Sequence, residues 1–217
     1  WSGINVGEGV LEIVPGEPVG DRPVFRAIST ARSNKFFSVF YKVRDRVESV
    51  IDAEGFFPHR IVIDQSHGPR KRYKEIHFDQ DDHRATLLYK DRETKYDVPP
   101  RVQDSLSSFY FFRNLPELEV GKSYFIDVHA SKKNFKMEVM VLKSETIETV
   151  LGKIPTIKVK AEVRYEGLLY NKGDLFIWVT DDKRRIPVMM KGKAKIGSIT
   201  ATLIEAEPFQ LRPAGGD

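Results

Sequence analysis

Asp45 is the residue whose position points most directly to chemistry. The alternation over residues 41–51 predicts a strand with one apolar and one charged face, and Asp45 lies on the apolar face between Val43 and Val47. A buried carboxylate must be paired or protonated, so we expect a cationic partner. We assign this role to Arg113, on the aromatic face of a predicted short helix. The pair would clamp the helix to the sheet, and the alternative is a ligand-contacting or acid–base role for Asp45.

The sequence contains no recognisable catalytic or metal-binding motif. It has no cysteine, and its five histidines lack the i, i+4 helical spacing of a metalloprotease motif. A Gly-x-Ser-x-Gly elbow and a phosphate-binding glycine loop are also absent. A general acid–base pair would need a second positioned carboxylate, which no pattern identifies. We therefore predict no catalytic residue, no metal and no cofactor, in a protein that is not an enzyme.

Aromatic residues concentrate in two short segments, 36–41 and 109–112. Beside a curved sheet such segments form ordinary core, or alternatively they line an apolar cavity that holds a lipid or acyl chain. The candidate ligand-binding residues are Phe36, Phe37, Phe40, Tyr41, Phe109, Tyr110, Phe112 and Trp178. Without a ligand, large side chains such as Phe176, Trp178 and Met189 would fill the enclosed volume.

These residues must be positioned by strands, because period-two alternation dominates the chain. It is clearest over residues 41–51, 135–141, 157–163 and 199–203, and turn signals separate further strands. We count about eleven or twelve strands, a number typical of a barrel, half-barrel or sandwich. Clean alternation also favours an antiparallel sheet with one solvated face over a parallel sheet under helices.

Two segments depart from the strand pattern. Residues 104–113 predict a short helix, with Asp104 as its N-cap and Pro116 beyond its end. Residues 31–40 contain phenylalanines at helical spacing and predict a second one. The expected fold is all-β: a large, strongly curved antiparallel sheet, half-open and barrel-like, with one or two short helices against its concave side. We expect a single domain over residues 1–217, with 208–217 as a tail.

A faint internal repeat links residues 50–58 and 179–187. In each segment a strand ends in Asp, a polar turn follows, and Pro comes six positions after the Asp. The turn chemistry and the proline are typical of a strand that turns back at a sheet edge. The repeat predicts two hairpins of one kind and is weaker evidence for duplication.

Composition excludes several classes of protein. The net charge is only +4, the sequence pI is about 9.1, and acidic residues are mixed with basic ones, so we expect no nucleic-acid partner. The densest basic cluster, Arg70–Lys74, is read as a solvated hairpin. No apolar run approaches the length of a membrane span. The chain starts at Trp1 within a strand-like stretch, so we expect a preceding segment such as a signal peptide.

Several motifs, in order along the chain, resemble a known family. They are Gly3–Gly9, Phe40–Ser49 with Phe57-Pro58, Asp104–Arg113, Leu118–Lys122, Thr149–Gly152, Gly173–Pro187 and Gly197–Thr200. Together they resemble DUF3108, a family of bacterial envelope proteins of unknown function. The resemblance implies an all-β fold and export to the periplasm or envelope of a Gram-negative bacterium, and it implies no activity.

The resulting expectation is a non-catalytic periplasmic or envelope protein that binds an apolar or lipid-like ligand in the cavity of a curved sheet. The alternative is a structural or interaction protein whose barrel is filled and whose surface docks an envelope partner. An enzyme acting on an envelope polymer is a third interpretation. A peripheral contact with a membrane is compatible with the first two.

Overall fold

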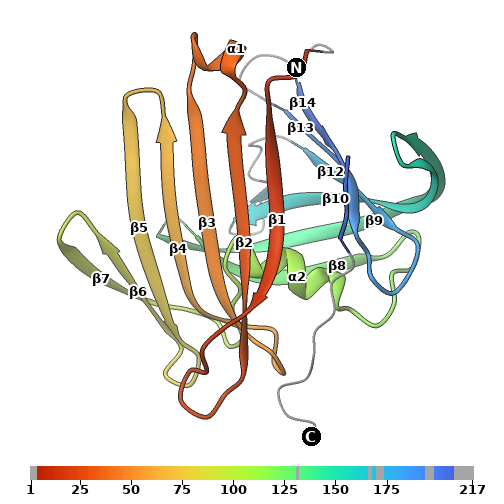
Figure 1. Cartoon of the computed structure of the whole chain (residues 1–217). Coiled ribbons are helices and arrows are strands. Elements are labelled where there is room, and N and C mark those ends of the chain that lie inside the picture. The colour runs from red at the N-terminus through yellow and green to blue at the C-terminus, as the bar shows by residue number, and fades with distance from the viewer. Residues whose placement is uncertain (1–3, 131, 166–167, 170–173, 194–197, 208–217) are drawn as a thin grey trace, which may run out of the picture.

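The computed structural model describes residues 4–130, 132–165, 168–169, 174–193 and 198–207. The predicted tail, 208–217, lies outside these ranges. The first sheet is an antiparallel meander in the order β1-β2-β3-β4-β5-β6-β7 (Figure 1). Its strands are β1 (Gly7–Pro15), β2 (Val24–Ser33), β3 (Val43–Asp52), β4 (Pro58–His67), β5 (Arg70–Asp79), β6 (Arg84–Tyr89) and β7 (Arg92–Asp97).

The second sheet has the order β14-β13-β12-β10-β9-β8, and the short β11 (Leu168–Leu169) also pairs with β10. Its strands are β8 (Ser123–Ala130), β9 (Lys133–Thr149), β10 (Gly152–Tyr165), β12 (Leu175–Thr180), β13 (Pro187–Lys193) and β14 (Ser198–Thr202). Every pairing between these strands is antiparallel, and the sheets do not close into a barrel. The predicted fold class, an all-β, half-open and barrel-like antiparallel architecture, is therefore confirmed.

The two helices behave differently from each other. Helix α2 (Ser107–Arg113) falls within the segment predicted to be helical and lies between the two sheets (Figure 1). The second predicted helix, 31–40, is reduced to the single turn α1 (Lys35–Ser38), because residues up to Ser33 extend β2. Helix α1 sits at the end of the β2–β3 hairpin and not against the concave side of the sheet.

Helix α2 contributes to two separate hydrophobic cores. Tyr110, 5% exposed, packs with the inward-facing residues of β2 to β6, among them Phe25 and Ile51. Phe112, 2% exposed, packs with the inner residues of β8, β9, β10 and β12. Phe109 contacts both cores. One turn of helix therefore joins the cores of the two sheets.

The loop before α2 joins the sheets along one side. Gln103 forms a parallel bridge with Val128 of β8: its amide donates to the Asp127 carbonyl, and its carbonyl accepts from the His129 amide. The Asn134 side-chain amide then donates to the carbonyl of Asp97, at the end of β7. Backbone groups of the loop are thus paired although Gln103 is buried.

The predicted pair of like hairpins is present as β3–β4 and β12–β13. In both, the register shifts just before the position where the proline, Pro58 or Pro187, pairs with the preceding strand. In both, the residue two before the proline has a positive φ, 53° at Phe56 and 46° at Arg185. The two hairpins therefore share a bulge and a turn, although the second turn is one residue longer.

Candidate functional site

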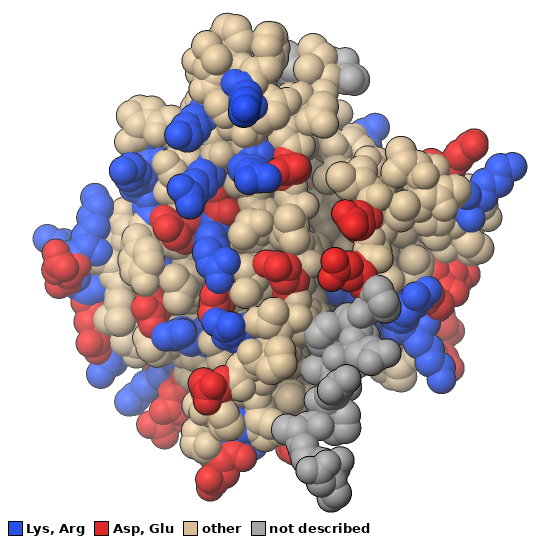
Figure 2. All heavy atoms as spheres, in the orientation of Figure 1, with Lys and Arg blue, Asp and Glu red and all other residues tan. Residues whose placement is uncertain are grey.

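The most exposed apolar surface that the structure describes is the end of the β2–β3 hairpin, which we call the α1 tip (Phe36, Val39, Phe40 and Tyr41). These side chains are 69%, 80%, 75% and 44% exposed. Figure 2 shows this end as a mostly uncharged knob at the top of the molecule, with a basic side chain on its face. Large exposed apolar side chains that lie side by side mark a contact surface more often than isolated ones do.

The α1 tip is held by hydrogen bonds and is not a loose loop. The Asn34 carboxamide oxygen accepts from the amide of Phe37 at 2.8 Å, and its Nδ2 donates to the Asn5 carbonyl at 2.6 Å. The Ser33 hydroxyl accepts from the Val43 amide at 2.9 Å and lies 2.7 Å from the hydroxyl of Ser38. These hydrogen bonds join the backbone that presents the aromatic rings to the start of β3 and to Asn5.

The predicted ligand-binding residues do not converge on one cavity. Phe36, Phe40 and Tyr41 point outward at the tip, and Phe37 is half-buried there. In the second aromatic segment, residues 109–112, Tyr110 packs in the first core and Phe112 in the second. Phe109 packs against both cores. Helix α1 lies at the top end of the first sheet, whereas α2 lies well below it between the two sheets, so the two aromatic segments are separated in space (Figure 1).

The predicted ligand-binding residue Trp178 belongs to neither of the two core clusters. Its neighbours Ile177 and Val179 belong to the second core, so the alternation turns Trp178 and Phe176 to the other face of β12. There the Lys158 ammonium lies 4.6 Å from the Trp178 ring centroid and 4.9 Å from that of Phe176. The Trp178 indole also donates to the Glu145 carboxylate at 2.9 Å. Trp178 is nevertheless only 7% exposed, so it is buried on this face, outside the second core cluster.

The predicted Asp45–Arg113 ion pair does not form. Asp45 lies at the tip end of β3, where it contacts His67 Nε2 at 2.8 Å and accepts from the Gln65 amide at 3.3 Å. Arg113 is the last residue of α2 and donates to the carbonyl of Arg184 at 2.8 Å. Its guanidinium also covers the rings of Phe109 and Tyr110, and burial lowers the pKa of Arg113.

The clamp between helix and sheet exists, but Asp104 makes it. The Asp104 carboxylate is fully buried and accepts from the amides of Leu106 and Ser107 at 2.6 and 2.7 Å. It also accepts from the hydroxyl of Ser49 on β3 at 2.5 Å. Burial raises the pKa of Asp104 although these hydrogen bonds oppose the shift. The predicted N-cap position was wrong, because α2 begins at Ser107 with Leu106 as its N-cap, two residues after Asp104. The Asp104 carboxylate still binds amides at this end of the helix, and the sequence did not predict its contact with β3.

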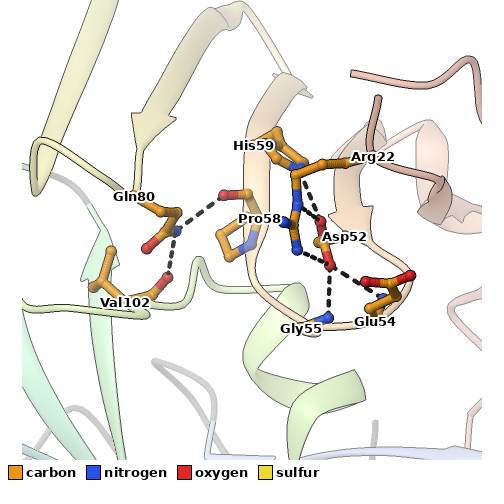
Figure 3. A network of polar contacts seen from close by, with 8 residues as sticks. All are labelled: Arg22, Asp52, Glu54, Gly55, Pro58, His59, Gln80 and Val102. Atoms are coloured by element: carbon orange, nitrogen blue, oxygen red, sulfur yellow. Dashed lines mark hydrogen bonds and ion pairs between the residues drawn. The ribbon is translucent and has the colours of Figure 1, made fainter. Parts of the chain in front are cut away.

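A second buried carboxylate, Asp52, organises the β3–β4 turn (Figure 3). It forms an ion pair with Arg22, accepts from the amides of Gly55 and Glu54 at 2.6 and 3.1 Å, and lies 3.4 Å from His59 Nε2. Burial alone would raise the pKa of Asp52, but the hydrogen bonds from Arg22, Gly55 and Glu54 prevail and lower it to about 2. The arrangement holds a turn and leaves the carboxylate no free oxygen for catalysis.

This lowered pKa predicts acid sensitivity. The folded pKa lies below the ordinary value of 3.8, so the folded state binds fewer protons than the unfolded state. The stabilisation is complete above that value and is lost as the pH falls toward about 2. We expect Asp52→Asn to weaken this part of the stability–pH curve, measured by urea unfolding at several acidic pH values. An exposed control, Asp64→Asn, should leave it unchanged; an identical effect of both variants would contradict the assignment.

The described residues also form a cleft of about 280 Å³ between the segment after α2 and the β12–β13 turn. It is lined by Glu117, Leu118, Glu119, Ile157, Asp181, Asp182, Lys183 and Arg185. The Arg184 guanidinium donates a hydrogen bond to the Asp182 carboxylate. The Arg185 guanidinium donates to the carbonyls of Arg113 and Pro116. In the described ranges no group of side chains is arranged to hold a metal ion. Most residues that line the cleft are charged, and none of the predicted ligand-binding residues is among them.

A family model described as "Protein of unknown function (DUF3108)" matches residues 1–204. The chain belongs to the DUF3108 family. The resemblance seen in the sequence motifs is therefore confirmed. The search of curated proteins gives no match to this DUF3108 chain. In the part of the chain that is described, no helix is long and apolar enough to span a membrane.

Two crystal structures are similar to this DUF3108 chain. One is a β-barrel-like protein of the domain of unknown function DUF1849 from Brucella abortus, with a TM-score of 0.60, 11% identity, and coverage of 92% of this chain and 86% of that chain. The other is a DUF1089 family protein from Pseudomonas aeruginosa, with a TM-score of 0.45, 12% identity, and coverage of 87% and 90%. The first likeness supports the barrel-like fold alone. Neither description states a catalytic activity.

Proposed function

We propose that this DUF3108 chain is a non-catalytic protein of the periplasm or cell envelope that acts by docking, and that the α1 tip is its contact surface. The observation that carries the proposal is the exposure of Phe36, Val39 and Phe40 on a turn that hydrogen bonds hold rigid. A rigid contact surface loses little conformational entropy on binding. The envelope location is part of the proposal and rests on the family resemblance.

The described interior supports docking over a ligand carried inside. Tyr110 and Phe112 occupy the two cores and Phe109 packs against both, whereas Phe36, Phe40 and Tyr41 lie exposed at the tip. Burial of an acyl chain would contribute about 0.8 kcal/mol per methylene, so an accessible apolar cavity would bind fatty acids measurably. Docking and ligand carriage therefore differ in the affinity of the protein for fatty acids, which a titration measures.

We expect no saturable binding of a fluorescent fatty acid to the interior. The test is a titration of the wild type beside Phe112→Ala, which would open space in the second core. Weak binding by both proteins, or new binding only in the variant, supports a filled barrel. Saturable micromolar binding by the wild type that persists in Phe36→Asp/Phe40→Asp would replace docking with ligand carriage. Fractionation of cells expressing the full-length protein would test its envelope location.

A further inference from the structure

We propose that the partner of the α1 tip is an anionic lipid surface. The tip combines exposed apolar side chains with a collar of cations on both faces of the sheet beneath it, and a peripheral membrane site needs these two components. This inference rests on the proposed docking function and specifies its partner.

Strand pairing assembles the collar from segments far apart in the sequence. On the outer face, Arg32 of β2 pairs with Arg44 of β3, and Lys71 of β5 lies in the same row, opposite Ser66 of β4. Figure 2 shows a band of Lys and Arg directly below the mostly uncharged tip. The cations of these strands therefore lie at the base of the tip, and Lys35 lies within α1 itself.

The collar continues on the inner face of β5. Arg72 and Lys74 share the parity of Ile76 and Phe78, which lie in the first core, so they point to the concave side. Burial lowers the pKa of Lys74, and the nearby positive charge of Arg72 adds a smaller decrease. In the basic run Arg70–Lys74, the even-numbered residues therefore lie on the inner face of β5, and Lys71 lies on the outer face.

Most of this charge is not neutralised within the protein. Residues 30–46 and 64–74 together contain nine Lys and Arg but two Asp, a net charge of +7, whereas the whole chain carries +4. Of the described residues, seven of these nine cations form no ion pair: Lys35, Lys42, Arg44, Arg70, Lys71, Arg72 and Lys74. The excess is therefore available to an external anionic surface.

The charge also decides between possible occupants of the tip. A second copy docked tip to tip would bring two clusters of +7 together, and like charges oppose such a contact. An anionic bilayer offers hydrocarbon for Phe36, Val39 and Phe40 and, at the headgroup level, negative charge for the cations below them. Tyr41, with a polar hydroxyl and 44% exposure, suits the boundary between the two.

The experiment is co-sedimentation of the purified chain with vesicles of phosphatidylcholine, with or without phosphatidylglycerol. We expect binding to the anionic vesicles, weakened by salt, and little binding to the neutral ones. Phe36→Asp/Phe40→Asp should reduce binding roughly tenfold or more. Val150→Asp/Leu151→Asp is the matched control, because these residues are 78% and 48% exposed at the β9–β10 turn. It should bind like the wild type.

The charge is tested in the same assay. Arg44→Glu/Lys71→Glu should also reduce binding roughly tenfold or more, whereas Lys90→Glu/Arg92→Glu, an equal charge reversal on the β6–β7 hairpin, should have a much smaller effect. Circular dichroism and thermal unfolding establish that each variant is folded.

Several outcomes would overturn the lipid proposal. They are no binding by the wild type, equal binding to neutral and anionic vesicles, or equal losses in tip and control variants. A wild-type dimer that Phe36→Asp/Phe40→Asp converts to a monomer would make the tip an interface between copies. These failures would leave docking to a protein intact, whereas saturable fatty-acid binding inside the barrel would remove the docking function itself.

Discussion

Asp104→Ala is expected to lower the free energy of unfolding by roughly 3–5 kcal/mol. The substitution would leave the Ser49 hydroxyl and the amides of Leu106 and Ser107 buried without their acceptor. Each unsatisfied group costs about 1–3 kcal/mol, and the losses are not fully additive. Urea unfolding at neutral pH measures the effect.

Asp104→Asn separates hydrogen bonding from charge. The amide oxygen still accepts from Leu106 and Ser107, and its nitrogen can donate to the Ser49 hydroxyl, so we expect a much smaller loss than in Asp104→Ala. Asp45→Ala is a second comparison, because that carboxylate is partly exposed at the tip end of β3. An Asp104→Ala protein as stable as the wild type would show that this contact does not hold α2 to the sheet.

Phe112→Ala is expected to destabilise the protein by about 3–5 kcal/mol, since the removed ring is almost fully buried in the second core. Because α2 also carries Tyr110 into the first core, we expect the whole chain to unfold in one transition at a lower urea concentration. This outcome would support the single domain predicted over residues 1–217.

The measurement is urea unfolding followed by far-ultraviolet circular dichroism and by tryptophan fluorescence. Phe111→Ala is the matched control, because Phe111 is only partly buried against the same core, and it should cost less. Two separate transitions, with the first sheet unaffected by Phe112→Ala, would contradict the single-domain prediction.

The fold was largely predictable because alternation reports directly on antiparallel strands. Residues 41–51 and 157–163 lie in or overlap β3 and β10, with the expected faces inward. β7 escaped prediction because five of its six residues are exposed and only Tyr96 provides an apolar contact. β13, with adjacent Met189 and Met190 and then Gly192, has no clear alternation either.

The candidate site was harder to predict, for physical reasons that differ from residue to residue. Alternation correctly placed Asp45 on the inner face, but its position along β3 decides its partner, and no local pattern reports that position. Trp178 was ambiguous because both faces of β12 are apolar. The phenylalanines of α1 seemed suited to a core, yet a single helical turn at a hairpin end has no sheet surface to cover.

The basic collar could be seen in the sequence only in part. The run Arg70–Lys74 was noticed, but Arg32 and Arg44 lie 26 or more positions earlier and join it only through the pairing of β2, β3, β4 and β5. A charge cluster built across strands is invisible to any window along the chain. Once the order of the strands is known, the cross-strand pairing of basic residues would reveal the collar.

Strand β3 begins at the α1 tip and ends at Asp52, and its ten residues span roughly 30 Å. The electrostatic screening length at physiological ionic strength is about 8 Å. A molecule docked by its tip would therefore hold the Arg22–Asp52 turn several screening lengths above the lipid headgroups. Docking and the acid titration of Asp52 would be electrically independent events at opposite ends of the same strand, so neither should report on the other.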